Sequence, residues 1–228
     1  GDPNGTLLGK IMPDGRRRSS IITSDEREVR GASARDIGGV ATGSVVCDYL
    51  TAWHPDRSFN GHAFQHTREL ALDPASGMLC VLDTIESKGD VAAAFGPVWH
   101  VQHVLARNDQ GFLCRTDFQD KFDGKTDASP PRPVWIAMSG PAGTKLNDVR
   151  WKFTARHGHN QISQEHHLTA EWRGTVTAGQ KLSFLTVLLP LADGATTPPG
   201  GLEVSVGEGG AKVSFAGAHI KLPCGEHP

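Results

Sequence analysis

The sequence predicts an all-β protein, an antiparallel and supersandwich-like β-sandwich of about ten to twelve strands with little helix. Short runs rich in Val, Ile, Thr, Phe and Trp recur along the chain, bounded by turn residues, as is typical of sandwiches. The 27 glycines and 14 prolines fall mostly between these runs. Hairpin-sized loops join neighbouring runs, which favours antiparallel pairing over parallel strands with helical crossovers.

The predicted strands follow one another in chain order, most of them five to ten residues long, as expected for strands. They are residues 19–24, 44–53, 63–72, 78–87, 98–107, 111–118, 134–139, 149–155, 167–177, 181–189, 202–207, 212–215 and 219–222. The loop 73–77 links two of the strongest runs. The loop 108–111 links two more and contains a glycine where a positive φ is often needed.

The run 181–189 is predicted to be a central strand. Its alternation places apolar side chains on both faces: Leu182, Phe184 and Leu188 on one, and Leu185, Val187 and Leu189 on the other. A strand that is apolar on both faces has to be covered on both faces. The segments 118–132 and 193–201 are predicted to be loops, and neither requires a domain boundary.

Length and charge limit the classes of function. The 228 residues suit a single β domain, with residues 1–30 as a polar leading edge. The net charge of −2 argues against a nucleic-acid-binding protein, which needs a broad basic face. No apolar run reaches the roughly 20 residues that span a bilayer, so no membrane partner is expected. The chain begins at Gly1 and shows no export signal.

The four cysteines do not form a C-x-x-C pair, which argues against a thiolate zinc site or a redox motif. Three of them, Cys47, Cys80 and Cys114, lie in apolar runs. We therefore expect them to be buried free thiols.

Histidine is unusually frequent, with 11 in the chain. His157 and His159 share one side of an extended segment, and His167 returns after a few residues as a hairpin partner would. Imidazoles that converge in this way can bind a divalent metal such as zinc, which is the candidate cofactor. The alternative is an exposed polar loop.

A second group of histidines includes His66, which is expected to share a face with Arg68 at a polar end of an apolar strand. His100 and His103 are three residues apart and so lie on opposite faces of one predicted strand, unless a bulge intervenes. At most one of them can join a site. The structural alternative for an inward-facing histidine of this group is a hydrogen bond to a carbonyl or to the carboxylate of Asp83.

Tryptophan is a further candidate for a binding residue, because sugar rings stack on the face of its indole. Trp53 and Trp99 are the candidate platforms for a sugar, and the alternative is that they fill the core. The sequence has no G-x-S-x-G, no Ser-x-x-Lys and no glycine-rich phosphate loop, which argues against hydrolase and nucleotide functions.

Several short motifs follow one another along the chain: DGR at 14–16, HTREL at 66–70, MLCVLDTI at 78–85 and VWH at 98–100. Their order resembles that of the C-terminal β-sandwich of heparinase II/III-like polysaccharide lyases. The WRG at 172–174 and the run LTVLLP at 185–190 also resemble the closing strands of that family.

The resemblance implies a sandwich module that binds an acidic, uronate-containing polysaccharide or oligosaccharide, or that acts on it by β-elimination. In the family a helical toroid precedes the sandwich and is an expected partner, and the location would be periplasmic or secreted. We transfer none of the family's zinc ligands, which precede the Asp-Gly segment. Elimination needs a base for the C5 proton and a cation for the uronate, which favours His66 or His103 as acid/base and Arg68 as the cation. The alternative is a self-contained β-sandwich that binds carbohydrate or metal through a histidine cluster.

Overall fold

The computed structural model describes residues 6–11, 17–20, 27–37, 40–49, 64–115, 132–151, 165–207 and 210–222. These residues form strands and loops, which confirms the predicted fold class. The strands are β1 (Thr6–Ile11), β2 (Arg17–Ser20), β3 (Arg27–Ile37), β4 (Val40–Tyr49), β5 (Phe64–Asp73), β6 (Met78–Ser87), β7 (Val91–Val101), β8 (His103–Arg107), β9 (Gly111–Arg115), β10 (Val134–Ser139), β11 (Lys145–Trp151), β12 (Glu165–Val176), β13 (Lys181–Pro190), β14 (Glu203–Gly207), β15 (Gly210–Phe215) and β16 (Ala218–Leu222).

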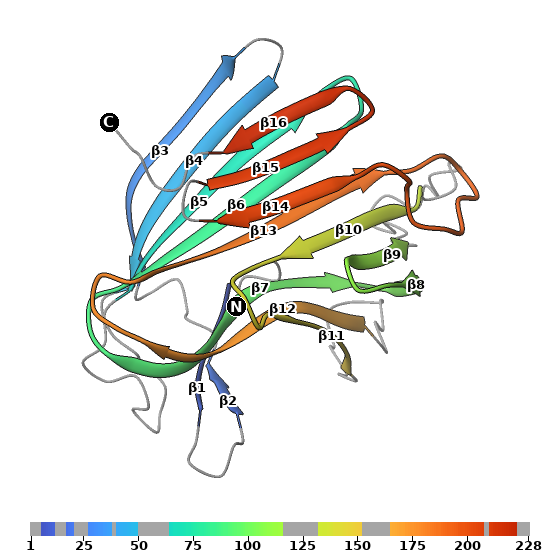
Figure 1. Ribbon diagram of the computed structural model, residues 1–228. Coiled ribbons are helices and arrows are strands. Elements are labelled where there is room, and N and C mark those ends of the chain that lie inside the picture. Colours follow the sequence, from blue (N-terminus) through green and yellow to red (C-terminus); the bar gives the residue numbers. More distant parts are fainter. Residues whose placement is uncertain are drawn as a thin grey trace, which may run out of the picture.

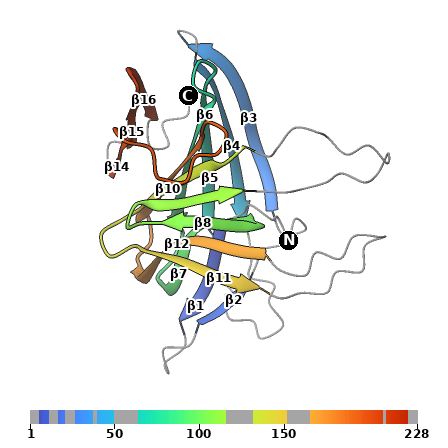
Figure 2. The same ribbon diagram turned by 90° about the vertical axis from the view of Figure 1, so that its right-hand side faces the viewer.

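The described strands form three antiparallel sheets (Figure 1). The largest has eight strands in the order β3-β4-β5-β6-β13-β10-β9-β8, the second has five in the order β11-β12-β7-β1-β2, and the third is β14-β15-β16. No helix of the described residues is long and apolar enough to cross a membrane. Figure 2 shows β14–β16 standing to one side of the large sheet.

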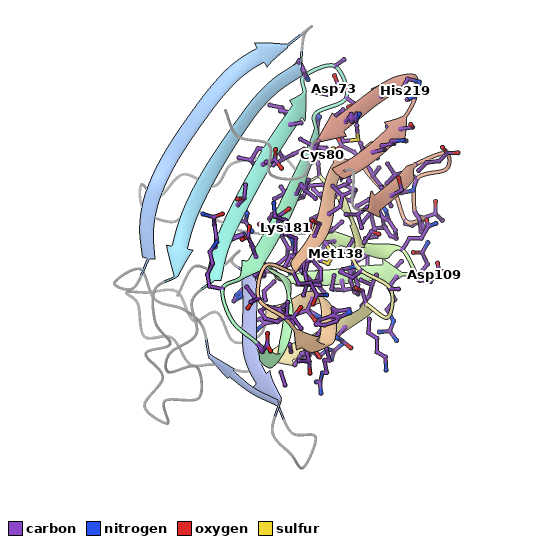
Figure 3. All side chains as sticks on the ribbon, turned by 60° about the vertical axis from the view of Figure 1, so that its left-hand side comes forward. Asp73, Cys80, Asp109, Met138, Lys181 and His219 are labelled. Carbon is purple, nitrogen blue, oxygen red and sulfur yellow. The ribbon has the colours of Figure 1, made fainter. Side chains whose placement is uncertain are left out.

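The eight-stranded sheet is the middle of three layers, because both of its faces are covered by apolar clusters. Strand β10 shows this directly: Trp135 and Ala137 belong to a cluster that includes residues of β15 and β16. The intervening Ile136 and Met138 belong to a second cluster that includes Leu168 of β12. Cys80 of the first cluster and Met138 of the second are labelled in Figure 3.

The central position predicted for residues 181–189 is confirmed. Strand β13 lies between β6 and β10 in the eight-stranded sheet. Leu185, Val187 and Leu189 all pack in the cluster beneath the three-stranded sheet. Phe184 alternates with them and is fully buried.

The predicted strand 98–107 is two strands in two different sheets. The chain leaves β7 after Val101 and enters β8 at His103, so that Gln102 is the point at which it passes from the five-stranded to the eight-stranded sheet. A run of alternating residues gives no signal of such a change of layer. This one divided run, together with β1 and β3, for which no strand was predicted, brings the thirteen predicted ranges to the sixteen described strands.

The β5–β6 hairpin sets the register on which the candidate site depends. The Asp73 carboxylate accepts hydrogen bonds from the backbone N–H of Ala75 at 3.1 Å and from the Ser76 hydroxyl at 2.6 Å. Gly77 has a φ of +71°, a conformation that glycine adopts without strain. The hairpin therefore pairs Asp73 with Met78, and the same register runs on along both strands.

Two of the predicted buried thiols are observed. Cys80 and Cys114 are free and buried, and burial raises the pKa of each to about 12, with a further contribution from the charge of Asp73 or Asp148. The side chain of Cys47 lies outside the described residues.

We expect Cys80 and Cys114 to be inert in the folded protein, because the reactive species is the thiolate. In a Cys47→Ser, Cys224→Ser variant, a disulfide reagent such as DTNB should label neither remaining thiol under native conditions and both in denaturant. Rapid labelling of the native variant would contradict their burial.

Candidate functional site

The candidate site is a charged cluster on β5 and β6 made of His66, Arg68 and Asp83. His66 and Arg68 are two residues apart on β5 and so project from the same face. Asp83 lies directly opposite Arg68 on β6. The structure therefore brings together two of the residues that the sequence predicted and adds the carboxylate of Asp83.

Three charge-assisted hydrogen bonds join the cluster. His66 Nε2–H donates to Asp83 Oδ1 at 2.7 Å. Arg68 Nε–H donates to the same oxygen at 2.7 Å, and Arg68 Nη2–H donates to Asp83 Oδ2 at 3.0 Å. This two-point contact between a guanidinium and a carboxylate is the strong, geometrically specific kind.

The cluster faces the five-stranded sheet. Asp83 pairs across β6–β13 with Phe184, and Thr186 lies two residues further along the same face of β13. Thr186 accepts a hydrogen bond at 3.1 Å from the indole N–H of Trp99, which belongs to β7 of the five-stranded sheet. The side chain of Asp83 is fully buried, that of His66 is 9% exposed and that of Arg68 is 20% exposed.

Charge balance keeps the buried carboxyl of Asp83 ionised. Burial alone would raise the pKa of Asp83, but the positive charge of Arg68 and the hydrogen bond from His66 outweigh it. The pKa is lowered from 3.8 to about 2. At neutral pH, Asp83 is therefore an anion that holds His66 and Arg68 in fixed positions.

Stability should depend on this carboxylate at acid pH. Because the pKa of Asp83 is lower in the folded protein, its contribution is fully present above about pH 4 and is lost as the pH falls towards 2. We expect the free energy of unfolding to fall by about 2 kcal/mol across this window on account of Asp83. Urea unfolding at several pH values measures it. An equal decline in an Asp83→Asn variant would contradict the assignment.

The cluster matches the structural alternative considered for His66, a histidine held by the carboxylate of Asp83. The pairing of Arg68 with Asp83 was not predicted. The hairpin loop 73–77 carried the signal, because pairing Asp73 with Met78 places residue 68 opposite residue 83 in an unbroken antiparallel register.

His103 lies apart from this cluster. It is exposed at the start of β8, the edge strand of the eight-stranded sheet. Five strand-to-strand steps separate β8 from β5, or about 24 Å along the sheet. His66 and His103 are therefore two separate candidates for the acid/base role, and only His66 shares a face with Arg68.

Trp99 is half-buried and packs against the apolar cluster between the two larger sheets, while its indole N–H is bound to Thr186. This position fits the core alternative considered for it. Trp53, the other predicted sugar platform, lies outside the described residues.

Of the three predicted metal ligands, only His167 is described; His157 and His159 lie outside the described residues. His167 of β12 pairs directly with His100 of β7. Their imidazole rings stack with centroids 3.9 Å apart and planes inclined by 29°. Within the described part of the chain, no three His, Cys, Asp or Glu side chains are grouped to hold a metal ion.

A second histidine–carboxylate pair was missed by the sequence analysis. His166 Nδ1–H of β12 donates to Asp148 Oδ1 of β11 at 2.7 Å. Their side chains are 12% and 17% exposed. This pair depends on the register of β11 and β12, in which Asp148 lies opposite Leu168, two residues from His166.

Comparison with known proteins gives matches in structure alone. No protein-family model matches the chain, and no curated protein matches its sequence. The fold is similar to that of the "Heparinase III-BT4657 gene product", with a TM-score of 0.51 and 13% identity over 86% of this chain. A form of that protein with methylated lysines gives 0.53 and 13% over 93%.

A heparan sulfate lyase HepC mutant from Pedobacter heparinus is also similar, with a TM-score of 0.56 and 11% identity over 89% of this chain. The match covers 27 to 29% of the length of these three structures, so this chain spans less than a third of them. At identities this low, the structural similarity shows the fold alone. The chain therefore has the β-sandwich fold of one part of heparinase III and heparan sulfate lyase structures.

Proposed function

We propose that this chain is the β-sandwich module of a polysaccharide lyase that acts on or binds a uronate-containing polysaccharide. One observation carries the proposal: the chain matches heparinase III and heparan sulfate lyase structures over 86 to 93% of its own length. In this account the helical toroid of such a lyase is the partner domain that completes the active site.

Within the module, we assign the acid/base role to His66 rather than His103. A carboxylate that binds one imidazole nitrogen orients the ring, which suits a group that takes the proton from C5 and passes it to the O4 oxygen as the C4–O bond breaks. Asp83 makes this contact with His66. Arg68 lies beside it. Its positive charge is placed to neutralise the uronate carboxylate, which favours the anion that forms when C5 loses its proton.

Variants of the two histidines test this assignment in a protein that contains the chain and cleaves heparan sulfate. We expect His66→Ala to lower kcat by about 10²- to 10⁴-fold, the usual contribution of a general acid or base. His103→Ala should leave kcat unchanged, as should the control His219→Ala. The measurement is the absorbance of the unsaturated uronate product. Full activity of His66→Ala would contradict the role, and loss with His103→Ala would transfer it to His103.

The isolated chain should bind the polymer without turning it over rapidly, because the acid/base candidate is nearly buried and the partner domain is missing. Robust turnover by residues 1–228 alone would contradict the module assignment and indicate a self-contained lyase.

Stacking of a sugar on Trp99 or Trp53 stays a prediction. A Trp99→Leu variant with normal polymer binding would exclude Trp99 as a platform.

The alternative is a self-contained β-sandwich that binds carbohydrate or metal through its histidines. The stacked pair of His100 and His167 is the observation that favours it. Metal analysis of protein purified without chelators or a histidine tag, combined with a polymer-binding measurement, separates the two accounts, because about one zinc per chain in a protein that binds no uronate polymer supports the alternative.

A further inference from the structure

The stacked histidines lie on the face of the five-stranded sheet that points away from the eight-stranded sheet. Trp99 precedes His100 on β7 and reaches Thr186 of the middle layer, so His100 projects to the opposite side. On β12, Leu168 belongs to the cluster between the sheets, and His167 beside it projects outward. Both imidazoles are half-buried, and the neighbouring Val149 of β11 is 49% exposed.

We propose that His100 and His167 together bind a divalent late transition metal ion, such as Ni²⁺ or Zn²⁺. Two residues directly opposite on antiparallel strands have Cβ atoms about 4.5–5.5 Å apart, which allows both side chains to reach one ion. Neither His100 nor a site made of this pair follows from the sequence hypothesis, which placed His167 with His157 and His159. The site stands independently of the proposed lyase function.

The cross-strand pairing of His100 and His167 places two imidazoles where both can be turned towards one ion. Two imidazole nitrogens at about 2.0–2.1 Å from a tetrahedral ion are about 3.4 Å apart. The ring centroids are 3.9 Å apart and the planes are inclined by 29°, so the rings are stacked, and rotation about the side-chain torsions has to turn one nitrogen of each ring towards a common ion. The strands fix the two residues opposite one another, so the backbone is already in place before an ion binds.

Each imidazole can bind the ion and keep a second contact. The ring has two nitrogens, and a metal-bound histidine commonly donates its other N–H to a neighbouring group. Imidazole is a suitable ligand for zinc, copper and nickel, and ions of this class tolerate water in the remaining positions. Two protein ligands make a weaker site than the three or four of a structural zinc centre.

The test is a calorimetric titration of untagged residues 1–228 with NiCl₂, paired with thermal unfolding. We expect one ion per chain and a rise in the unfolding midpoint at saturating Ni²⁺, because an ion that binds only the folded state stabilises it. His100→Phe and His167→Phe keep a flat ring in the stack and remove the nitrogens. Each should raise Kd at least about tenfold, since even groups behind a metal ligand contribute about 10- to 100-fold.

The control is His219→Ala, an exposed histidine of β16 that binds Ser214 and lies in a different sheet. It should bind Ni²⁺ as the unaltered chain does. Should either Phe variant fail to fold, His100→Gln and His167→Gln replace them. Loss of binding in the His100 and His167 variants supports the site, whether or not a His157→Ala, His159→Ala variant also weakens it. No binding by the unaltered chain, unchanged binding in the Phe or Gln variants, or loss confined to the His157, His159 variant would overturn it.

Discussion

Replacing Asp83 with alanine is expected to lower the free energy of unfolding by about 3–5 kcal/mol, the usual cost of breaking a buried ion pair from one side. The carboxylate of Asp83 is fully buried and accepts hydrogen bonds from both His66 and Arg68. Without it, the Arg68 guanidinium stays in a mostly buried position and loses both of the hydrogen bonds that it makes to Asp83. Urea unfolding at neutral pH measures the loss.

The matched control removes both charges together. In a variant with Asp83→Leu and Arg68→Met, both members of the ion pair are removed, and apolar side chains of similar size replace a buried pair with little net cost. We expect this double variant to be clearly more stable than Asp83→Ala. If the two variants were equally destabilised, the loss would come from packing around Asp83 and not from the broken ion pair with Arg68.

Replacing Trp135 with alanine is expected to lower the free energy of unfolding by about 3–5 kcal/mol, as for other buried aromatic residues. Trp135 is 1% exposed and packs in the cluster that joins the eight-stranded sheet to β15 and β16. Loss of its side chain would leave a cavity between two layers. Chemical unfolding followed by far-UV circular dichroism gives the change in stability.

Leu105 provides the comparison, because it is also a large apolar residue but is 45% exposed on β8. Leu105→Ala should change the free energy of unfolding by less than about 0.5–1 kcal/mol. A similarly small effect for Trp135→Ala would contradict the description of β14–β16 as a layer packed on the large sheet.

The fold class could be predicted because strands carry their own signal. In β13, apolar residues on both faces required a central position with cover on each side, and the structure has this arrangement. The assignment of strands to sheets could not be predicted in the same way. The chain changes layer at Gln102 within one alternating run, and nothing in the alternation records which sheet a strand joins. Strand β3 was missed because REVRGASARDI is polar and rich in small residues.

The candidate site was only partly accessible from sequence for a related reason. His66 and Arg68 are neighbours on one strand, so their common face follows from spacing. Their partner Asp83 comes from the next strand and depends on the register set by the 73–77 turn. The pairs His100–His167 and Asp148–His166 join residues far apart in the chain, and they depend on which strands become neighbours.

The proposed function requires that the chain recognises a uronate polymer, and this recognition can be measured as binding at equilibrium. Residues 1–228 are titrated with heparan sulfate oligosaccharides and, in parallel, with the same oligosaccharides after chemical reduction of the uronate carboxylates to alcohols. Sulfation and chain length are then matched, and only the carboxylates differ. We expect saturable binding of the native oligosaccharides and markedly weaker binding of the reduced ones. No binding of either, or equal binding of both, would contradict it.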